Sequence, residues 1–143
     1  MSGRLTSRLR LLIPALALLA AGCVSGRYPV AGRVTYEDGT PVEAGTVIGE
    51  ATVDGKAVGV QGNIEKDGSF TWGSDKPGDG APPGTYKVLV QPRALGDAEL
   101  GEGKRPAVAG KYTKFASSGL TFEVKPEKNV FNITVSRPKP KGE

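Results

Sequence analysis

Four Asp-Gly dipeptides punctuate the chain, at residues 38–39, 54–55, 67–68 and 79–80. Asp-Gly is a strong signal for a tight β-turn, because glycine takes positive φ without penalty and aspartate tolerates it. The segments around these turns alternate apolar and polar residues, which is the two-residue period of a half-buried strand. We predict seven strands, over residues 28–36, 45–53, 56–64, 69–72, 84–92, 120–124 and 131–135.

This pattern predicts an all-β fold, a single seven-stranded antiparallel Ig-like sandwich over residues 28–136. Short strands separated by frequent turn signals are typical of such sandwiches, and the chain after residue 22 shows no convincing helical period. Two segments do not fit the strand pattern. Residues 94–106 are expected to form a flexible loop within a long connection. Residues 137–143 are expected to form a disordered basic tail.

The first 22 residues have the features of a signal peptide. Three arginines and no acidic residue precede an apolar run over residues 11–21, which is 11 residues long. About 20 residues are needed to span a bilayer, so the run indicates a cleaved export signal helix and not a permanent span. Without these three arginines the net charge falls from +4 to +1. The basic composition therefore does not indicate a nucleic-acid partner.

Cys23 is the only cysteine of the chain, and it ends the sequence L-A-A-G-C. Small residues before a cysteine at the end of an apolar run resemble the bacterial lipobox. The resemblance implies cleavage between Gly22 and Cys23 and acylation of the thiol. Residues 23–27 would then tether an exported protein to membrane lipid, on the outer or inner membrane of a bacterium, facing the periplasm or the surface. The alternative is an ordinary secretory signal that leaves a free thiol.

Four short patterns carry a family likeness: V-x-G-x-V at residues 30–34, G-x-P at 39–41, a loose D-x-x-G-x-F-like step at 65–70, and G-x-Y-x-V at 84–88. Together they resemble the carboxypeptidase regulatory-like domain, a transthyretin-like (prealbumin-like) β-sandwich. Joined to a lipobox, the arrangement is similar to small lipoproteins of planctomycete bacteria. The resemblance implies a binding or structural role in the cell envelope, because this domain accompanies the carboxypeptidase enzyme and does not perform its chemistry.

The composition argues against enzymatic chemistry. The chain has no histidine, which excludes Ser-His and Cys-His pairs and histidine-ligated metals. The sequence G-E-G-K-R at residues 101–105 fails the phosphate-loop pattern, because Ala98 and Arg105 occupy two of its required positions. The aspartates of the Asp-Gly pairs lack the close ligand spacing of a calcium loop and are interpreted as turn residues. We expect no catalytic residue, cofactor or metal.

Trp72, Tyr86 and Tyr36 are the candidate ligand-binding residues. If their rings were exposed on a sheet face, they would form a platform for sugar rings, and the domain would be a carbohydrate-binding module. Their alternation also fits packing in the core. Besides membrane lipid, an envelope protein or polysaccharide is the expected kind of partner. The basic tail is expected either to remain solvated or to contact anionic lipid or polymer.

Overall fold

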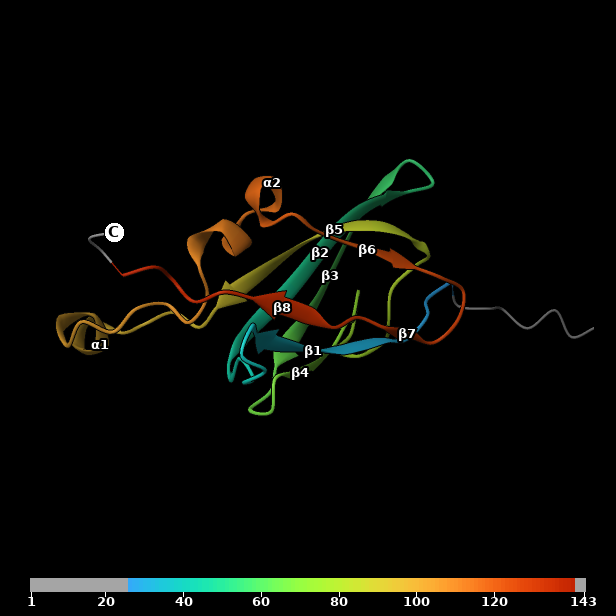
Figure 1. Ribbon diagram of the computed structural model, residues 1–143. Coiled ribbons are helices and arrows are strands. Elements are labelled where there is room, and N and C mark those ends of the chain that lie inside the picture. Colours follow the sequence, from blue (N-terminus) through green and yellow to red (C-terminus); the bar gives the residue numbers. More distant parts are fainter. Residues whose placement is uncertain (1–25, 141–143) are drawn as a thin grey trace, which may run out of the picture.

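The structure, a computed structural model, describes residues 26–140 and consists mainly of two β-sheets (Figure 1). The first sheet has the order β3-β2-β5-β6 and contains β2 (Gly45–Val53), β3 (Lys56–Ile64), β5 (Gly84–Pro92) and β6 (Leu120–Val124). The second contains β1 (Val30–Tyr36), β4 (Ser69–Thr71), β7 (Asn129–Val130) and β8 (Ile133–Val135). The prediction of an all-β, two-sheet chain is confirmed. The predicted signal peptide, with Gly22 and Cys23, lies outside the described residues.

Three of the four predicted Asp-Gly turns form as the sequence indicates, whereas Asp79-Gly80 comes after a turn that ends where the Asp79 N–H donates to the Lys76 carbonyl. The glycines at positions 39, 55, 68 and 80 all have positive φ, between 75° and 88°. At the tip of the β2–β3 hairpin, Asp54 is also left-handed, with φ of 50°. Positive φ at both central residues defines a type I′ turn, which matches the natural twist of a hairpin. This turn sets the register, in which Val53 pairs with Lys56 and Gly45 with Ile64.

The prediction of a purely antiparallel sandwich is wrong at one place. β1 pairs antiparallel with β4 along one edge, and parallel with both β7 and β8 along the other. The register is the same for both parallel strands, since Val30 pairs with Asn129 and Val34 with Ile133. The predicted strand over residues 131–135 is therefore the second half of one parallel partner of β1, which is interrupted at residues 131–132. Apolar alternation does not report strand direction, so the pattern of residues does not predict this parallel pairing.

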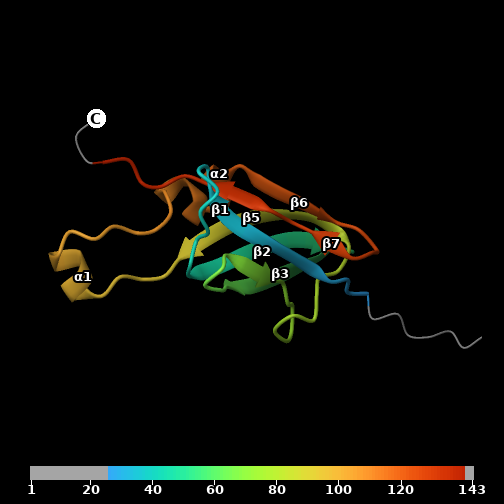
Figure 2. The same cartoon turned by 60° about the horizontal axis from the view of Figure 1, so that its bottom comes forward.

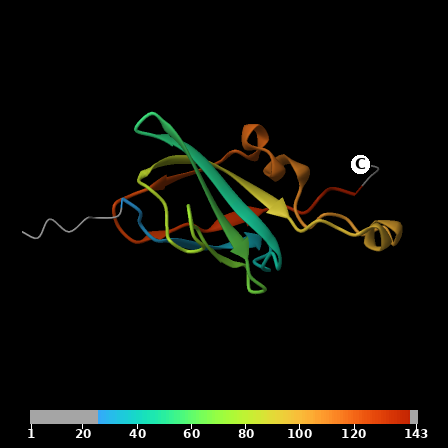
Figure 3. The same cartoon turned by 180° about the vertical axis from the view of Figure 1, so that it is seen from behind.

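The core lies between the two sheets, which Figure 2 shows as layers with β1 in front of β2, β3 and β5. Viewed from behind, the β2–β3 hairpin (green) crosses in front of β1 (Figure 3). Valines dominate the buried positions, and the aromatic rings gather around Trp72. Phe70, Phe122 and Phe131 place their ring centroids 6.4, 6.0 and 5.8 Å from that of Trp72. The alternation that predicted the strands therefore also predicted which side chains are buried.

Three short helices occupy the connection between β5 and β6, where the sequence predicts none. These are α1 (Asp97–Gly101), the 3-10 helix η1 (Gly110–Thr113) and α2 (Phe115–Ser118). Tyr112 is buried and packs η1 against the core of the sandwich. The Ser118 hydroxyl is also buried and donates a hydrogen bond to the Val88 carbonyl of β5. None of the helices in residues 26–140 has the length and apolar character that crossing a bilayer requires.

Candidate functional site

Two of the three candidate ligand-binding aromatics are buried in the core. Trp72 and Tyr86 each have 0% exposed area, and their ring centroids lie 5.5 Å apart. The Tyr86 hydroxyl donates to the Pro82 carbonyl at 2.8 Å. The interpretation of these rings as an exposed sugar platform is therefore corrected: both rings are buried in the core between the two sheets, where no sugar reaches them. The core interpretation is confirmed for both.

Tyr36, the third candidate, is half-buried and lines a cavity of about 500 Å³ at one end of the sandwich. We call this the strand-end cavity. Its walls come from the β1–β2 connection, the segment after β5 and the segment after β8. The lining residues are Tyr36, Pro41, Glu43, Ala44, Arg93, Leu95, Glu99, Lys104, Arg105, Ala107 and Arg137. The structure therefore separates Tyr36 from Trp72 and Tyr86 and groups it with residues that the sequence did not connect to it.

The topology explains why these segments meet. β1 and β8 run parallel, so their carboxyl ends lie at the same end of the sandwich. β2 is antiparallel to β5, and Gly45 at its start pairs with Pro92 at the end of β5. Three strands thus end beside the start of a fourth. Figures 1 to 3 show α1 and the segment that follows β8 at this end, and the segment that leads into β1 at the opposite end.

An arginine follows each of two strand ends and is held in place by an acidic partner. Arg93, next after β5, donates to both carboxylate oxygens of Glu99 in α1, at 2.8 and 3.1 Å. The Glu99 carboxylate also accepts a hydrogen bond from the Gly96 N–H at 3.0 Å. This capping of the first turn explains α1, which the sequence pattern did not predict. The short helix lies within residues 94–106, whose predicted flexibility stays a prediction.

Arg137 after β8 is fixed in the same way. Its guanidinium lies 3.8 Å from the centroid of the Tyr36 ring, and it donates to Asp38 at 3.0 Å and to the Thr40 hydroxyl at 2.9 Å. The Tyr36 hydroxyl in turn donates to the Ala107 carbonyl at 2.9 Å. The first residue of the predicted basic tail is therefore attached to the end of β1, and two residues later the Lys139 carbonyl accepts a hydrogen bond from Arg105.

Two carboxylates beside the strand-end cavity, those of Asp38 and Glu99, have lowered pKa values. The Thr40 hydroxyl and N–H, with help from Arg137, lower the pKa of Asp38 to about 2. The Arg93 guanidinium, followed by the Gly96 N–H, lowers the pKa of Glu99 to about 2. Burial raises the pKa of Tyr36, and the Arg137 charge opposes that effect. Both carboxylates are thus ionised at neutral pH and hold their arginines in fixed orientations.

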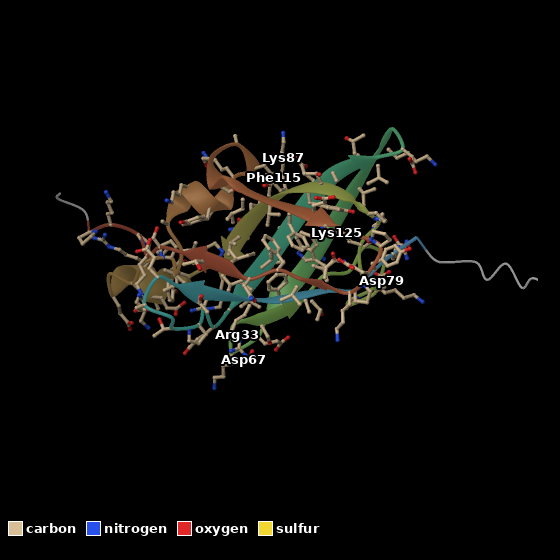
Figure 4. The ribbon with its side chains drawn as sticks, turned by 45° about the vertical axis from the view of Figure 1, so that its right-hand side comes forward. Arg33, Asp67, Asp79, Lys87, Phe115 and Lys125 are labelled. Atoms are coloured by element: carbon tan, nitrogen blue, oxygen red, sulfur yellow. The ribbon has the colours of Figure 1, made fainter. Side chains whose placement is uncertain are left out.

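Other aspartates of the Asp-Gly pairs accept hydrogen bonds from residues of neighbouring turns. Asp67 accepts hydrogen bonds from the Ser69 N–H and hydroxyl, and Asp38 does the same with Thr40. Asp79 accepts from the Ser74 N–H at 2.6 Å and pairs with Arg27 at 3.0 Å. Figure 4 shows Asp67 beside Arg33, and Asp79 at the far end from α1. Within residues 26–140, no three acidic or cysteine side chains come together as metal ligands.

A smaller hollow of about 210 Å³ lies beside β3, between the strand and the turn over residues 73–78. Its lining includes Gln61, Asn63 and Lys76, together with the backbone of the turn. Its charged lining residues are Glu65, Asp75 and Lys76, whereas the larger strand-end cavity gathers four cations and is the better candidate site. Comparison of the chain with protein-family models, with curated proteins and with solved structures found no match.

Proposed function

We propose that the protein is an exported bacterial lipoprotein, anchored in a membrane through an acylated Cys23. Its β-sandwich acts as a non-catalytic binding or structural module of the cell envelope. We further propose the transthyretin-like arrangement for this sandwich. The two-sheet architecture, the positive φ of the motif residue Gly39 and the close approach of the motif residue Gly32 to the Phe131 carbonyl support that assignment.

The observation that carries the proposal is the placement of the strand-end cavity. The first described residue, Gly26, lies at the end of the sandwich where β1 begins, and the cavity lies where β1 ends (Figure 1). β1 has seven residues, which corresponds to a length of about 23 Å. A lipid at Cys23, three residues before Gly26, would hold the near end at the membrane. The cavity would then face outward, where it meets envelope components.

Mass spectrometry of the mature N-terminal peptide tests the anchor directly. We expect a chain that begins at Cys23 and carries diacylglyceryl and acyl groups, and that fractionates with membranes. The Cys23→Ala variant should lose the lipid mass, whereas a matched Ser25→Ala variant should keep it. A mature peptide with an unmodified, alkylatable thiol would overturn the lipoprotein proposal in favour of an ordinary secretory signal.

A further inference from the structure

The charges that line the strand-end cavity are predominantly positive. Four cationic side chains and two acidic ones line it: Arg93, Lys104, Arg105, Arg137, Glu43 and Glu99. These side chains surround a single hollow and do not form a stripe along a sheet face. A grouped set of cations around one concave site is suited to a compact anion.

Three of the four cations already have acidic partners. Arg93 pairs with Glu99 and Arg137 with Asp38, while the Lys104 ammonium lies 3.2 Å from Glu102. Each of these pairs fixes a cationic head group on the cavity wall. Because the partners offset part of their charge, each of these three residues contributes less charge to the cavity than an unpaired cation would.

Arg105 differs from the other three. Within residues 26–140 its only hydrogen bond is to a neutral group, the Lys139 carbonyl, at 2.8 Å. A guanidinium has five N–H donors in a rigid fork, so most of those of Arg105 remain free. No carboxylate of the described residues lies within 4.0 Å of the Arg105 guanidinium. Each of the other three cations has such a carboxylate. Arg105 is therefore the cation of this cavity whose charge is available to a ligand.

Neighbouring contacts hold Arg105 in position. Its own bond to Lys139 ties it to the tail, and two residues later the Ala107 carbonyl accepts the Tyr36 hydroxyl at 2.9 Å. The Ala109 N–H then donates to the Ser136 carbonyl at 3.0 Å. The segment is thus attached to the end of β1 and to the tail after β8, which reduces the ordering cost of binding.

Apolar groups complete the cavity. Pro41, Leu95 and Ala107 line it together with the Tyr36 ring, so a ligand meets carbon surface as well as charge. The volume of about 500 Å³ lies within the range of small-molecule sites, which is roughly 300–1,000 Å³. The arginine fork fits a carboxylate and a phosphate equally well, because both present paired oxygens.

We propose that the strand-end cavity binds a small organic anion, with its carboxylate or phosphate against Arg105 and its apolar part against Leu95 and Ala107. The inference rests on the proposed function, because it names the ligand class of the binding module. Lys104, adjacent to Arg105, supplies a second charge near the same anion.

Benzoate, phenyl phosphate and benzyl alcohol test the proposal, since they share one ring and differ only in the head group. Each is titrated calorimetrically into the full chain in a neutral detergent, up to about 10 mM. We expect saturable binding of benzoate, phenyl phosphate or both, and none of benzyl alcohol. The difference between the two anions identifies the preferred head group. Arg105→Gln should weaken binding about tenfold or more, the usual effect of losing a charged hydrogen bond.

Lys87→Gln is the matched control, because it removes the same charge from the outer face of β5 (Figure 4). It should leave binding unchanged, while Lys104→Gln should weaken it and serves as the second variant should Arg105→Gln unfold. Three results would overturn the proposal: no saturation with either anion, equal binding of benzyl alcohol, or equal weakening by Lys87→Gln. The lipid mass at Cys23 is measured separately, so failure of the anchor and failure of the anion site are distinguishable.

Discussion

Replacing Gly32 by alanine should destabilise the protein through a single steric conflict. Gly32 lies in β1 opposite the interruption between β7 and β8, where the Phe131 N–H donates to the Ala31 carbonyl at 2.8 Å. A Cβ at Gly32 would lie 1.7 Å from the Phe131 carbonyl oxygen. Real Cβ atoms essentially never come closer than 3.0 Å to such an atom, so β1 and the segment around Phe131 must separate by about 1.3 Å.

The cost follows from what that separation disrupts. Forcing one extra carbon into packed structure costs about 1–3 kcal/mol. Losing the hydrogen bond between Phe131 and Ala31 adds about 1 kcal/mol. Phe131 also stacks on Phe122 at 4.2 Å, so its displacement disturbs the aromatic core. We expect a loss of about 2–4 kcal/mol from a total stability that is usually about 5–15 kcal/mol.

Urea unfolding followed by the fluorescence of Trp72, the only tryptophan, measures the change. Gly59→Ala in β3 is the matched control, because a Cβ there meets nothing within 4 Å. The same substitution in both places cancels the effect of alanine on the unfolded chain, which is about 0.4–1 kcal/mol. Equal unfolding midpoints for the two variants would refute the parallel pairing of β1 with the interrupted strand.

Two further predictions concern the core and the acidic residues. Trp72→Ala should cost about 3–5 kcal/mol. Trp72→Phe should cost less, because it also removes a buried Nε1–H that has no hydrogen-bond partner; equal losses in urea unfolding followed by circular dichroism would contradict this. Folding lowers the pKa values of Asp38 and Glu99 to about 2, from about 4 in the unfolded chain. Their contribution to stability is therefore full above about pH 5 and is lost as the pH falls towards 2. The urea midpoint should fall over that range, and less steeply in an Asp38→Asn, Glu99→Gln double variant; an unchanged slope would contradict the assignment.

The local features of the fold could be predicted from the sequence, because each depends on neighbouring residues. The alternation in residues 45–53 and 56–64 reproduces β2 and β3 at both bounds, and the Asp54-Gly55 turn sets their register. For Trp72, the alternation of apolar and polar residues does not decide whether the ring is buried or exposed. Alternation places a ring on one face of a strand, but only the position of the opposite sheet decides whether that face is buried.

The sequence pattern does not predict helix α1, and the reason differs from that for Trp72. Its residues carry no apolar period, and its first turn depends on Glu99 accepting hydrogen bonds from Gly96 and Arg93. Arg93 and Glu99 are six residues apart, which is not a contact spacing within a helix, and they lie on either side of the β5–α1 connection, so no period of a single element links them. The useful signal was the charge pattern: an arginine directly after the end of β5, followed by a glutamate within reach of a turn.

The strand-end cavity depends on strand direction, which alternation does not encode. In the sequence, the long β5–β6 connection and the basic tail are two segments that no pattern relates to each other. They meet because β8 runs parallel to β1, which places Arg137 over the ring of Tyr36, 101 positions earlier in the chain. An antiparallel β8 would carry the tail to the end where Gly26 lies and would leave Arg105 without its contact to Lys139. The pairing that Gly32 permits therefore also assembles the candidate site, so the stability of Gly32→Ala and its affinity for an anion should decline together.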